Sequence, residues 1–235
     1  MKSLIKEKGF TLVEIAIVLV IIGLLLGGIL KGQELINSAR VRNLADQNSG
    51  IQAAYYGFID RYRQVPGDWS ASAAKTAIGV DIFGGGNGNG RIDDDLTEAV
   101  AVWEQLAKSN FIGGGFNPYD GSGVADEDAY KTFAPVNAFN GALTLTRNAD
   151  YEGTANVRLN LHVGNNIPVT IARELDVKVD DSKPNTGILR LTIDGAGAVF
   201  STLHALGATC ATASDNTGEY DIAGDGQDCG QVFLY

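Results

Sequence analysis

An isolated carboxylate in an apolar stretch is the first residue of this sequence whose position suggests chemistry. Glu14 is the only ionisable side chain from Phe10 to Leu30, and a leader with three lysines precedes that stretch. Roughly 20 apolar residues form a helix about 30 Å long, which is enough to span a bilayer. Ionisable side chains inside membranes are costly and usually have a partner and a function. We therefore expect Glu14 to have a binding partner.

An oxygen-rich loop is the second candidate, and it suggests metal binding. Its potential ligands are Asn87, Asn89, Asp93 and Asp95. Calcium takes six to eight oxygen ligands, which amides, carboxylates and backbone carbonyls can supply. The spacing is not that of an EF-hand, because Gly85 and Leu96 stand where that loop has acidic residues. Two interpretations remain open: a calcium site, or a turn cluster with a helix cap and no ion.

The remaining polar residues indicate less. The stretch from Asp215 to Asp228 is rich in acids, which is typical of an acidic surface, with a second calcium site as the alternative. His162 falls in a strand pattern and His204 near a turn, and we expect structural roles for both. The sequence has no recognisable phosphate-binding loop, paired-acid motif or nucleophile elbow, so we expect no enzyme activity.

The only two cysteines of the chain, Cys210 and Cys229, have 18 residues between them. If this part of the chain is exported, a disulfide between them is expected. Closing a loop of this length would stabilise the fold by roughly 3 kcal/mol on the chain-entropy model. The alternative is a pair of free, buried thiols.

The overall charge limits the partners of the chain. It has 235 residues, with 18 basic and 28 acidic side chains, for a net charge of −10. Residues 1–9 contribute three lysines and Glu7, a net of +2, so the rest of the chain carries −12. Phosphate binding needs clustered Lys and Arg, so we do not expect a general nucleic-acid or anionic-membrane surface.

One long helix must position Glu14. No proline occurs before Pro66, and the apolar run continues into an amphipathic pattern from Leu35. Apolar residues then recur at three- and four-residue steps, at Ile51, Tyr55, Phe58 and Tyr62. This spacing predicts a helix from Phe10 to Tyr62, whose second half packs on the rest of the protein.

The remaining pattern predicts a mixed fold. A helix is expected over Leu96–Ser109, with Asp95 as its N-cap and Glu98 completing a capping box. Alternating segments predict three antiparallel strands, over residues 141–147, 156–163 and 187–193. Between the last two strands, a helix is expected over residues 167–179. The fold class is therefore α+β, with a long N-terminal helix packed on a C-terminal antiparallel sheet.

The segment Lys8-Gly9-Phe10-Thr11-Leu12-Val13-Glu14 resembles the processing site of type IV prepilins and type II secretion pseudopilins. A cleavable secretory signal fits less well, because the run is too long and lacks an A-x-A-like site. A plain transmembrane anchor explains the length but not Glu14. The resemblance implies cleavage by prepilin peptidase between Gly9 and Phe10, methylation of the new amine on Phe10, and pairing of that amine with Glu14 of a neighbouring subunit.

The resemblance also implies an organisation. Residues 1–9 would be a cleaved leader, 10–34 a hydrophobic helix for the membrane or the fibre core, and 35–235 a periplasmic or extracellular head, giving a pilin-like lollipop. Two later segments are similar to one subgroup of prepilin-type proteins: Pro66–Trp69 with its glycine–asparagine loop, and Leu175–Gly187, where Ser182 replaces a glycine. Major pseudopilins bind calcium in a head loop, which adds to the first interpretation of Asn87–Asp95.

The expected function is that of a structural subunit of a type IV pilus-like filament, polymerised through its N-terminal helix. Its expected partners are copies of itself, prepilin peptidase and an inner-membrane assembly platform. It would start in the bacterial inner membrane and end in a cell-surface or periplasmic filament. The alternatives are a type II secretion pseudopilin, a minor pilin, or a membrane-anchored binding protein that never polymerises.

Overall fold

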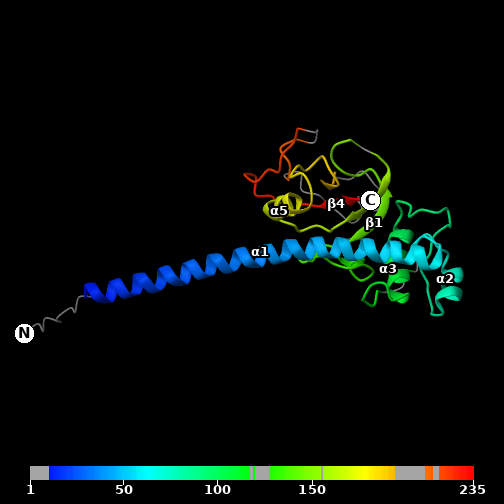
Figure 1. The fold of residues 1–235 in the computed structure, drawn as a ribbon, viewed down its shortest axis with the longest axis horizontal. Helices are drawn as coiled ribbons and strands as arrows, with labels where there is room; N and C mark the ends of the chain where they lie inside the picture. The colour runs from blue at the N-terminus through cyan, green and yellow to red at the C-terminus, as the bar shows by residue number, and fades with distance from the viewer. Residues whose placement is uncertain (1–10, 117–118, 120–126, 155, 194–209, 214–216) are drawn as a thin grey trace, which may run out of the picture. The chain divides into compact units, whose positions relative to one another are not determined.

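The computed structural model describes residues 11–116, 119, 127–154, 156–193, 210–213 and 217–235 (Figure 1). Its elements follow the order α1 (Leu12–Tyr62), α2 (Ala71–Ile78), α3 (Leu96–Lys108), α4 (Glu127–Tyr130), β1 (Thr144–Asn148), β2 (Arg158–His162), α5 (Val169–Val179), β3 (Leu189–Leu191) and β4 (Gln231–Leu234). The chain divides after Arg40 into two compact units. The long N-terminal helix is confirmed from Leu12 to Tyr62.

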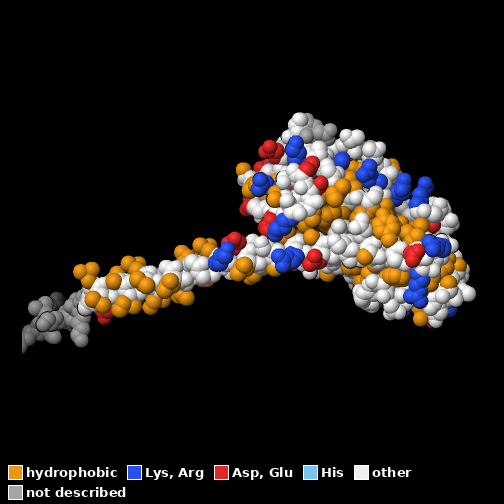
Figure 2. All heavy atoms as spheres, viewed as in Figure 1, with side chains coloured by type: hydrophobic (Ala, Val, Ile, Leu, Met, Phe, Trp, Pro, Cys, Tyr) orange, Lys and Arg blue, Asp and Glu red, His pale blue; other side chains and the backbone are white. Residues whose placement is uncertain are grey.

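The first unit contains the apolar half of α1. Every Val, Ile and Leu side chain from Leu12 to Ile36 is exposed, from 47% at Ile15 to 89% at Leu12. Figure 2 shows these hydrophobic side chains along the visible face of the helix. Among the described residues, α1 is the one helix long and apolar enough to cross a membrane. A helix that is hydrophobic all round needs lipid or protein to cover it.

The second unit is built on a four-stranded antiparallel sheet with the order β1-β2-β4-β3. β1 and β2 pair from Thr144 opposite His162 to Asn148 opposite Arg158. β4, the last strand in the sequence, lies between β2 and β3, which do not pair with each other. The antiparallel sheet is therefore confirmed, and its centre includes a strand that the sequence pattern did not predict.

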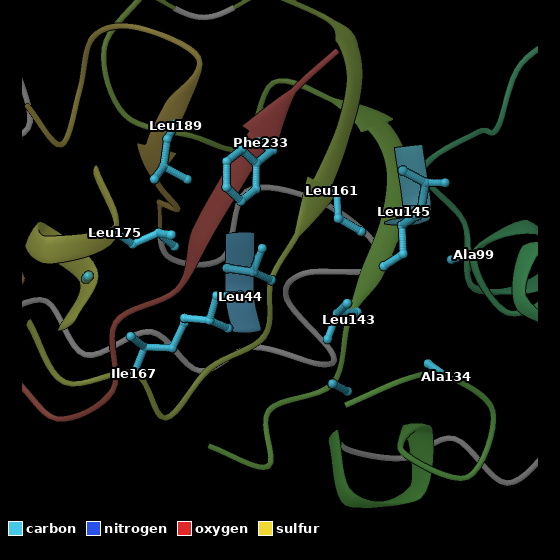
Figure 3. Close-up of a cluster of buried hydrophobic side chains, with 14 of the residues drawn as sticks. Leu44, Ala99, Ala134, Leu143, Leu145, Leu161, Ile167, Leu175, Leu189 and Phe233 are labelled. Atoms are coloured by element: carbon cyan, nitrogen blue, oxygen red, sulfur yellow. The ribbon is translucent and has the colours of Figure 1, made fainter. Parts of the chain in front are cut away.

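The core lies between the sheet and the part of α1 from Val41 onward. Leu44 of α1 is fully buried, and Figure 3 shows it among side chains of all four strands and of the α5 region. The other α1 residues that are buried are Val41, Ile51, Ala54, Tyr55 and Phe58, which repeat at the spacing of one helix face. The packing of the long helix on the sheet is therefore confirmed.

α3 contributes to the core through Trp103 and is hydrogen-bonded to Tyr130 of α4. Trp103 is fully buried, and its indole N–H donates to the Tyr130 hydroxyl at 3.1 Å. That hydroxyl donates in turn to the backbone carbonyl of Ala99 at 3.1 Å. Burial of these polar groups is thereby offset by hydrogen bonds. The helix ends at Lys108, one residue before the predicted end.

The other elements differ from prediction mainly at their ends. The helix predicted over 167–179 begins at Val169, because Pro168 occupies the N-cap position. The three predicted strands are shorter than their alternating segments. α2 is an unpredicted short helix that ends at Ile78 and is followed by Gly79 as its C-cap, in a left-handed conformation with φ 84°.

Candidate functional site

The N-terminus of α1 is closed by a reciprocal pair of hydrogen bonds. The Thr11 hydroxyl accepts from the Glu14 backbone N–H at 3.2 Å, and Oε2 of Glu14 accepts from the Thr11 backbone N–H at 2.7 Å. The Thr11 hydroxyl also donates to the same Glu14 oxygen at 2.9 Å. This is a capping box, so the isolated carboxylate has a partner within its own chain. Gly9 and Phe10 lie outside the described residues.

Four glycines give the apolar part of α1 a surface with little side-chain cover: Gly23, Gly27, Gly28 and Gly32. The helix continues through all four, and a Cβ atom built at any of them would have no neighbour within 4 Å. Small residues of this kind let helices approach closely in membranes. This part of α1 therefore exposes both apolar area and accessible backbone.

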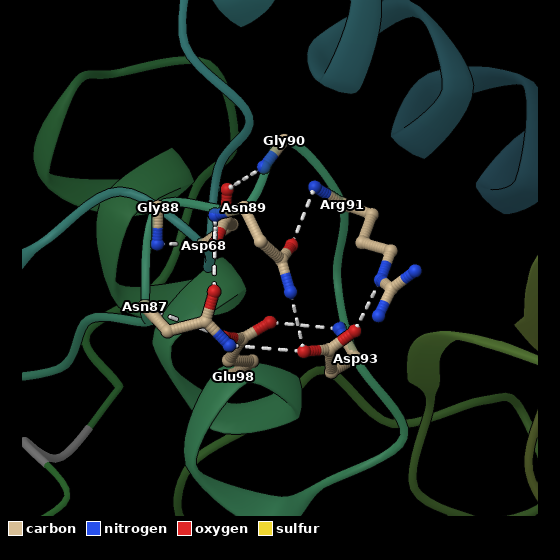
Figure 4. Close-up of polar contacts among 8 residues, drawn as sticks. All are labelled: Asp68, Asn87, Gly88, Asn89, Gly90, Arg91, Asp93 and Glu98. Atoms are coloured by element: carbon tan, nitrogen blue, oxygen red, sulfur yellow. Dashed lines mark hydrogen bonds and ion pairs between the residues drawn. The ribbon is translucent and has the colours of Figure 1, made fainter.

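The glycine-rich loop after α2 is held by three buried carboxylates, Asp68, Glu98 and Glu104, which are 2–3% exposed. Asp68 follows the Pro66–Gly67 turn and faces the tip of the loop. Its Oδ1 accepts from the backbone N–H groups of Gly88 at 2.7 Å and Asn89 at 3.0 Å, and its Oδ2 accepts from Gly90 at 2.7 Å (Figure 4). One carboxylate thus satisfies three successive backbone donors.

Glu98 of α3 holds the two sides of the same loop. Its Oε1 accepts from the Asn87 backbone N–H at 3.1 Å and its Oε2 from the Asp93 N–H at 2.7 Å. Burial raises the pKa of Glu98, these two hydrogen bonds oppose that rise, and the nearby Asp95 and Asp68 add to it. The predicted capping box is therefore half correct. Asp95 caps α3 by accepting from Glu98 N–H at 3.0 Å, but the Glu98 carboxylate reaches back to Asp93 and Asn87.

Glu104 and Gln105, one turn or more further along α3, hold the start of the loop. Glu104 accepts from the backbone N–H groups of Phe83 at 3.1 Å and Gly84 at 2.6 Å. Gln105 donates to the carbonyls of Gly84 at 3.0 Å and Trp69 at 2.7 Å. The buried polar side of α3 therefore satisfies the backbone of a loop that has no sheet or helix partner of its own.

The four predicted calcium ligands lie in this loop but do not all offer oxygens to a common point. Nδ2 of Asn87 and Nδ2 of Asn89 both donate to Oδ2 of Asp93, at 2.9 and 2.7 Å. These hydrogen bonds, that of Asn87 first, and the one from Arg91 keep the pKa of Asp93 below its usual value. Oxygens of Asp93, Asp95 and Glu98 lie within 4.8 Å of one another. The three carboxylates fit a cation, whereas the two asparagines do not in this arrangement, so calcium stays a prediction.

The C-terminal part of the second unit contains the predicted disulfide. Cys210 and Cys229 are bonded, which confirms the first interpretation of these two residues. Tyr220 lies between the two cysteines in the sequence. Its hydroxyl donates to Asp176 of α5 at 2.7 Å and accepts from Gln231 of β4 at 2.9 Å, which connects the segment between the cysteines to both elements. His162 is fully buried in β2.

The acidic stretch 215–228 lies partly outside the described residues, and His204 lies wholly outside them. In the described part, Asp221 accepts from the Gly224 N–H at 3.0 Å and Asp228 from the Asn166 N–H at 2.7 Å. A second group of carboxylates that could hold a metal lies near α5 and consists of Asp176, Asp180 and Asp181. None of the three was a predicted ligand.

The N-terminal segment matches a known family model. Residues 4–30 match the prokaryotic N-terminal methylation motif, which is the hallmark of type IV pilins and pseudopilins. The match covers residues 4–9 of the leader with two of its lysines, the Gly9–Phe10 junction and Glu14. The chain is therefore a pilin-like protein that carries the prepilin cleavage and methylation motif. No curated protein and no solved structure is significantly similar to it.

Sequence reasoning missed the buried carboxylates of the loop. A binary pattern assigns Glu98, Glu104 and Gln105 to the solvent face of α3, because the apolar face runs through Val100 and Trp103. A usable signal was present: Glu98, Ala101 and Gln105 recur at helical spacing, opposite a run of glycines whose backbone donors need acceptors. Both observations together indicate a second buried face.

Proposed function

We propose that the protein is a structural subunit of a type IV pilus-like filament, processed after Gly9 by prepilin peptidase and polymerised through α1. The observation that carries this proposal is the methylation motif on a helix whose apolar side chains are exposed from Leu12 to Ile36. Such a helix needs a membrane before assembly and other helices afterwards. We expect no enzyme activity.

In the proposed mechanism, the basic leader keeps the precursor oriented in the inner membrane. Cleavage exposes the amine of Phe10, which becomes a cation at membrane depth. Glu14 of the neighbouring subunit then binds that amine. Its carboxylate already accepts from Thr11 N–H through Oε2, and a carboxylate has two oxygens, so it can keep its capping role while it binds the amine.

Packing between helices provides the cohesion of the proposed filament. Lipid tails are as apolar as leucine, so leaving the membrane brings little hydrophobic gain. Close approach and van der Waals contact must supply the difference, and Gly23, Gly27, Gly28 and Gly32 leave room for it. Glu14 would set the axial register of each added subunit.

Two variants test the role of Glu14. Glu14→Ala should be cleaved normally but should give far fewer filaments, because the amine of the neighbour is left without its partner. The matched control is Glu34→Ala, an exposed glutamate of the same helix that pairs with Lys31 at 2.7 Å. Equal filament yields from both variants would refute the register role of Glu14.

Sheared surface filaments separate the alternatives. Abundant mature chain beginning at Phe10 by N-terminal sequencing identifies a major pilin, and traces identify a minor pilin. Mature chain that is absent from sheared material but found in periplasmic filaments identifies a pseudopilin. Mature chain found only as a membrane-bound monomer identifies an anchored binding protein. An uncleaved chain in cells that have prepilin peptidase would refute the processing itself.

A further inference from the structure

The chain contains three Asn–Gly sequences, and two of them are adjacent at the tip of the loop that Asp68 holds. Residues 87–90, which form these two pairs, are all exposed. The third pair is Asn140–Gly141, whose glycine is buried against Asn165. Asn–Gly is the dipeptide most prone to a spontaneous reaction of the side-chain amide, so these positions are potential modification sites.

The reaction needs no enzyme and only water as a co-reactant. The glycine backbone nitrogen attacks Cγ of the asparagine, a C–N bond forms, and the Cγ–Nδ2 bond breaks. Ammonia leaves and carries away the proton of the glycine N–H. Water then opens the resulting succinimide at one of its two carbonyls, which leaves aspartate or isoaspartate. Glycine favours the closure because it has no Cβ that obstructs the approach.

Asp68 holds both attacking nitrogens. The N–H of Gly88 donates to its Oδ1 and the N–H of Gly90 to its Oδ2, each at 2.7 Å. Ring closure requires each nitrogen to lose its proton and move towards Cγ of the preceding asparagine. Because Asp68 is only 3% exposed, water does not readily replace it as the acceptor. Both attacking nitrogens are therefore hydrogen-bonded to Asp68 in the closed loop, and these hydrogen bonds must break before either nitrogen can move towards Cγ.

Asp93 binds the two side-chain amide nitrogens that would leave as ammonia. Its Oδ2 accepts from Nδ2 of Asn87 at 2.9 Å and from Nδ2 of Asn89 at 2.7 Å (Figure 4). The carbonyl oxygens of the same side chains accept from backbone N–H groups two residues further on, at Asn89 (3.0 Å) and Arg91 (3.1 Å). Each amide is thus fixed at both ends, which restricts rotation of Cγ towards the following glycine.

We propose that residues 87–90 form a deamidation site gated by Asp68 and Asp93. The two asparagines stay intact while both carboxylates hold the loop, and they convert when the loop opens. Conversion is one-way. It replaces the two amide donors that face Asp93 with carboxylates, which repel Asp93 and Glu98. Isoaspartate also lengthens the backbone by one methylene, which moves the glycine N–H groups away from Asp68. The loop therefore cannot close again in the same form.

The test measures conversion at each asparagine separately. The full chain in detergent is incubated at mildly alkaline pH, and peptide mapping by mass spectrometry follows the amide-to-acid change at Asn87, Asn89 and Asn140. A synthetic peptide of residues 84–93 gives the ungated rate. The variants are Asp68→Asn and Asp93→Ala, and the latter removes a partly exposed side chain that is not part of the core. Asp81→Asn is the matched control, because Asp81 is an exposed aspartate that pairs with Lys75 instead of the loop backbone.

We expect wild type and Asp81→Asn to convert more slowly than the peptide at both loop positions. Losing one hydrogen bond to a charged group changes an equilibrium by roughly tenfold or more, and reaction from an open state follows its population. Asp68→Asn should therefore raise the rate at Asn89 at least about tenfold, because the new side-chain amide can keep its oxygen towards Gly88, but its nitrogen cannot accept from Gly90. Asp93→Ala should raise the rate at both positions.

Asn140 distinguishes local gating from general unfolding. Its glycine N–H donates to Asn137 at 2.9 Å, away from the loop, so its rate should stay unchanged in all variants. A wild-type rate equal to the peptide rate would overturn the proposal. So would loop rates that are unchanged in both gate variants, or an equal rise at Asn140, because the effect would then come from global opening.

Discussion

Replacing Gly85 by alanine should destabilise the second unit of the chain, because the backbone around this position leaves no room for a Cβ atom. A Cβ atom at this position would lie 2.7 Å from the Trp69 carbonyl oxygen and 2.9 Å from the Ser70 carbonyl carbon, with the Ala71 nitrogen closer still. All three are backbone atoms at the start of α2, so no side-chain rotation can relieve the contact. Overpacking of this kind typically costs about 1–3 kcal/mol, and we expect about 3 kcal/mol here.

For a domain of this size, 1 kcal/mol corresponds to a change in melting temperature of roughly 2–4 °C, so the expected decrease is about 6–12 °C. Circular dichroism on the full chain in detergent measures it. Gly115→Ala is the matched control, because a Cβ atom there has no neighbour within 4 Å. Both variants lose the same unfolded-state entropy, so their difference isolates the packing effect. Equal melting temperatures for Gly85→Ala and Gly115→Ala would refute a steric conflict at Gly85.

The remaining predictions concern the buried acids, the disulfide and the metal. Glu104→Ala should lower the melting temperature more than Glu104→Gln, because only alanine leaves the Phe83 and Gly84 N–H groups without any acceptor. Burial raises the pKa of Asp150 from 3.8 to about 6 in the folded protein, so the folded state takes up a proton at a higher pH than the unfolded state. The free energy of unfolding, measured with urea, should therefore rise by roughly 1–2 kcal/mol relative to Asp150→Asn as the pH falls from above 6 to below 4. A decrease over that range would contradict burial as the cause. Changing Cys210 and Cys229 together to alanine should cost roughly 3 kcal/mol, visible as a lower urea midpoint. Calcium binding requires that calcium raise the melting temperature and that Asp93→Asn abolish the rise; unchanged melting with calcium and with a chelator would remove that prediction.

Much of the fold could be predicted because its signals are local. The apolar run, the absence of proline before Pro66 and the helical spacing from Ile51 to Tyr62 specify α1 within one chain segment. Alternation indicates β1, β2 and β3 in the same way. β4 was missed because Gln231–Leu234 is short and buried on both faces, which removes the alternation that marks a half-exposed strand.

The candidate sites also differ in how local their sequence signals are. Glu14 and the Gly9–Phe10 junction could be recognised as part of the methylation motif because that motif depends on a short, fixed spacing. The loop could not, because its structure depends on pairings between distant residues, such as Asp68 with Gly88 and Glu104 with Gly84. A carboxylate that accepts from backbone donors has no sequence signature of its own. Glu98 was therefore interpreted only as part of a capping box, Asp68 and Glu104 were given no role, and the calcium ligands were chosen without Glu98.

The position of β4 determines the order in which the elements of this protein can fold. β2 and β3 have no hydrogen bonds to each other and are joined only through Gln231–Leu234. The Tyr235 hydroxyl also donates to Asn48 of α1 at 2.7 Å, across 187 residues of sequence. A chain that emerges from its N-terminus can therefore form α1 early, but its sheet stays open until the last strand arrives. For the proposed filament subunit, this order means that α1 enters the membrane before the sheet is complete.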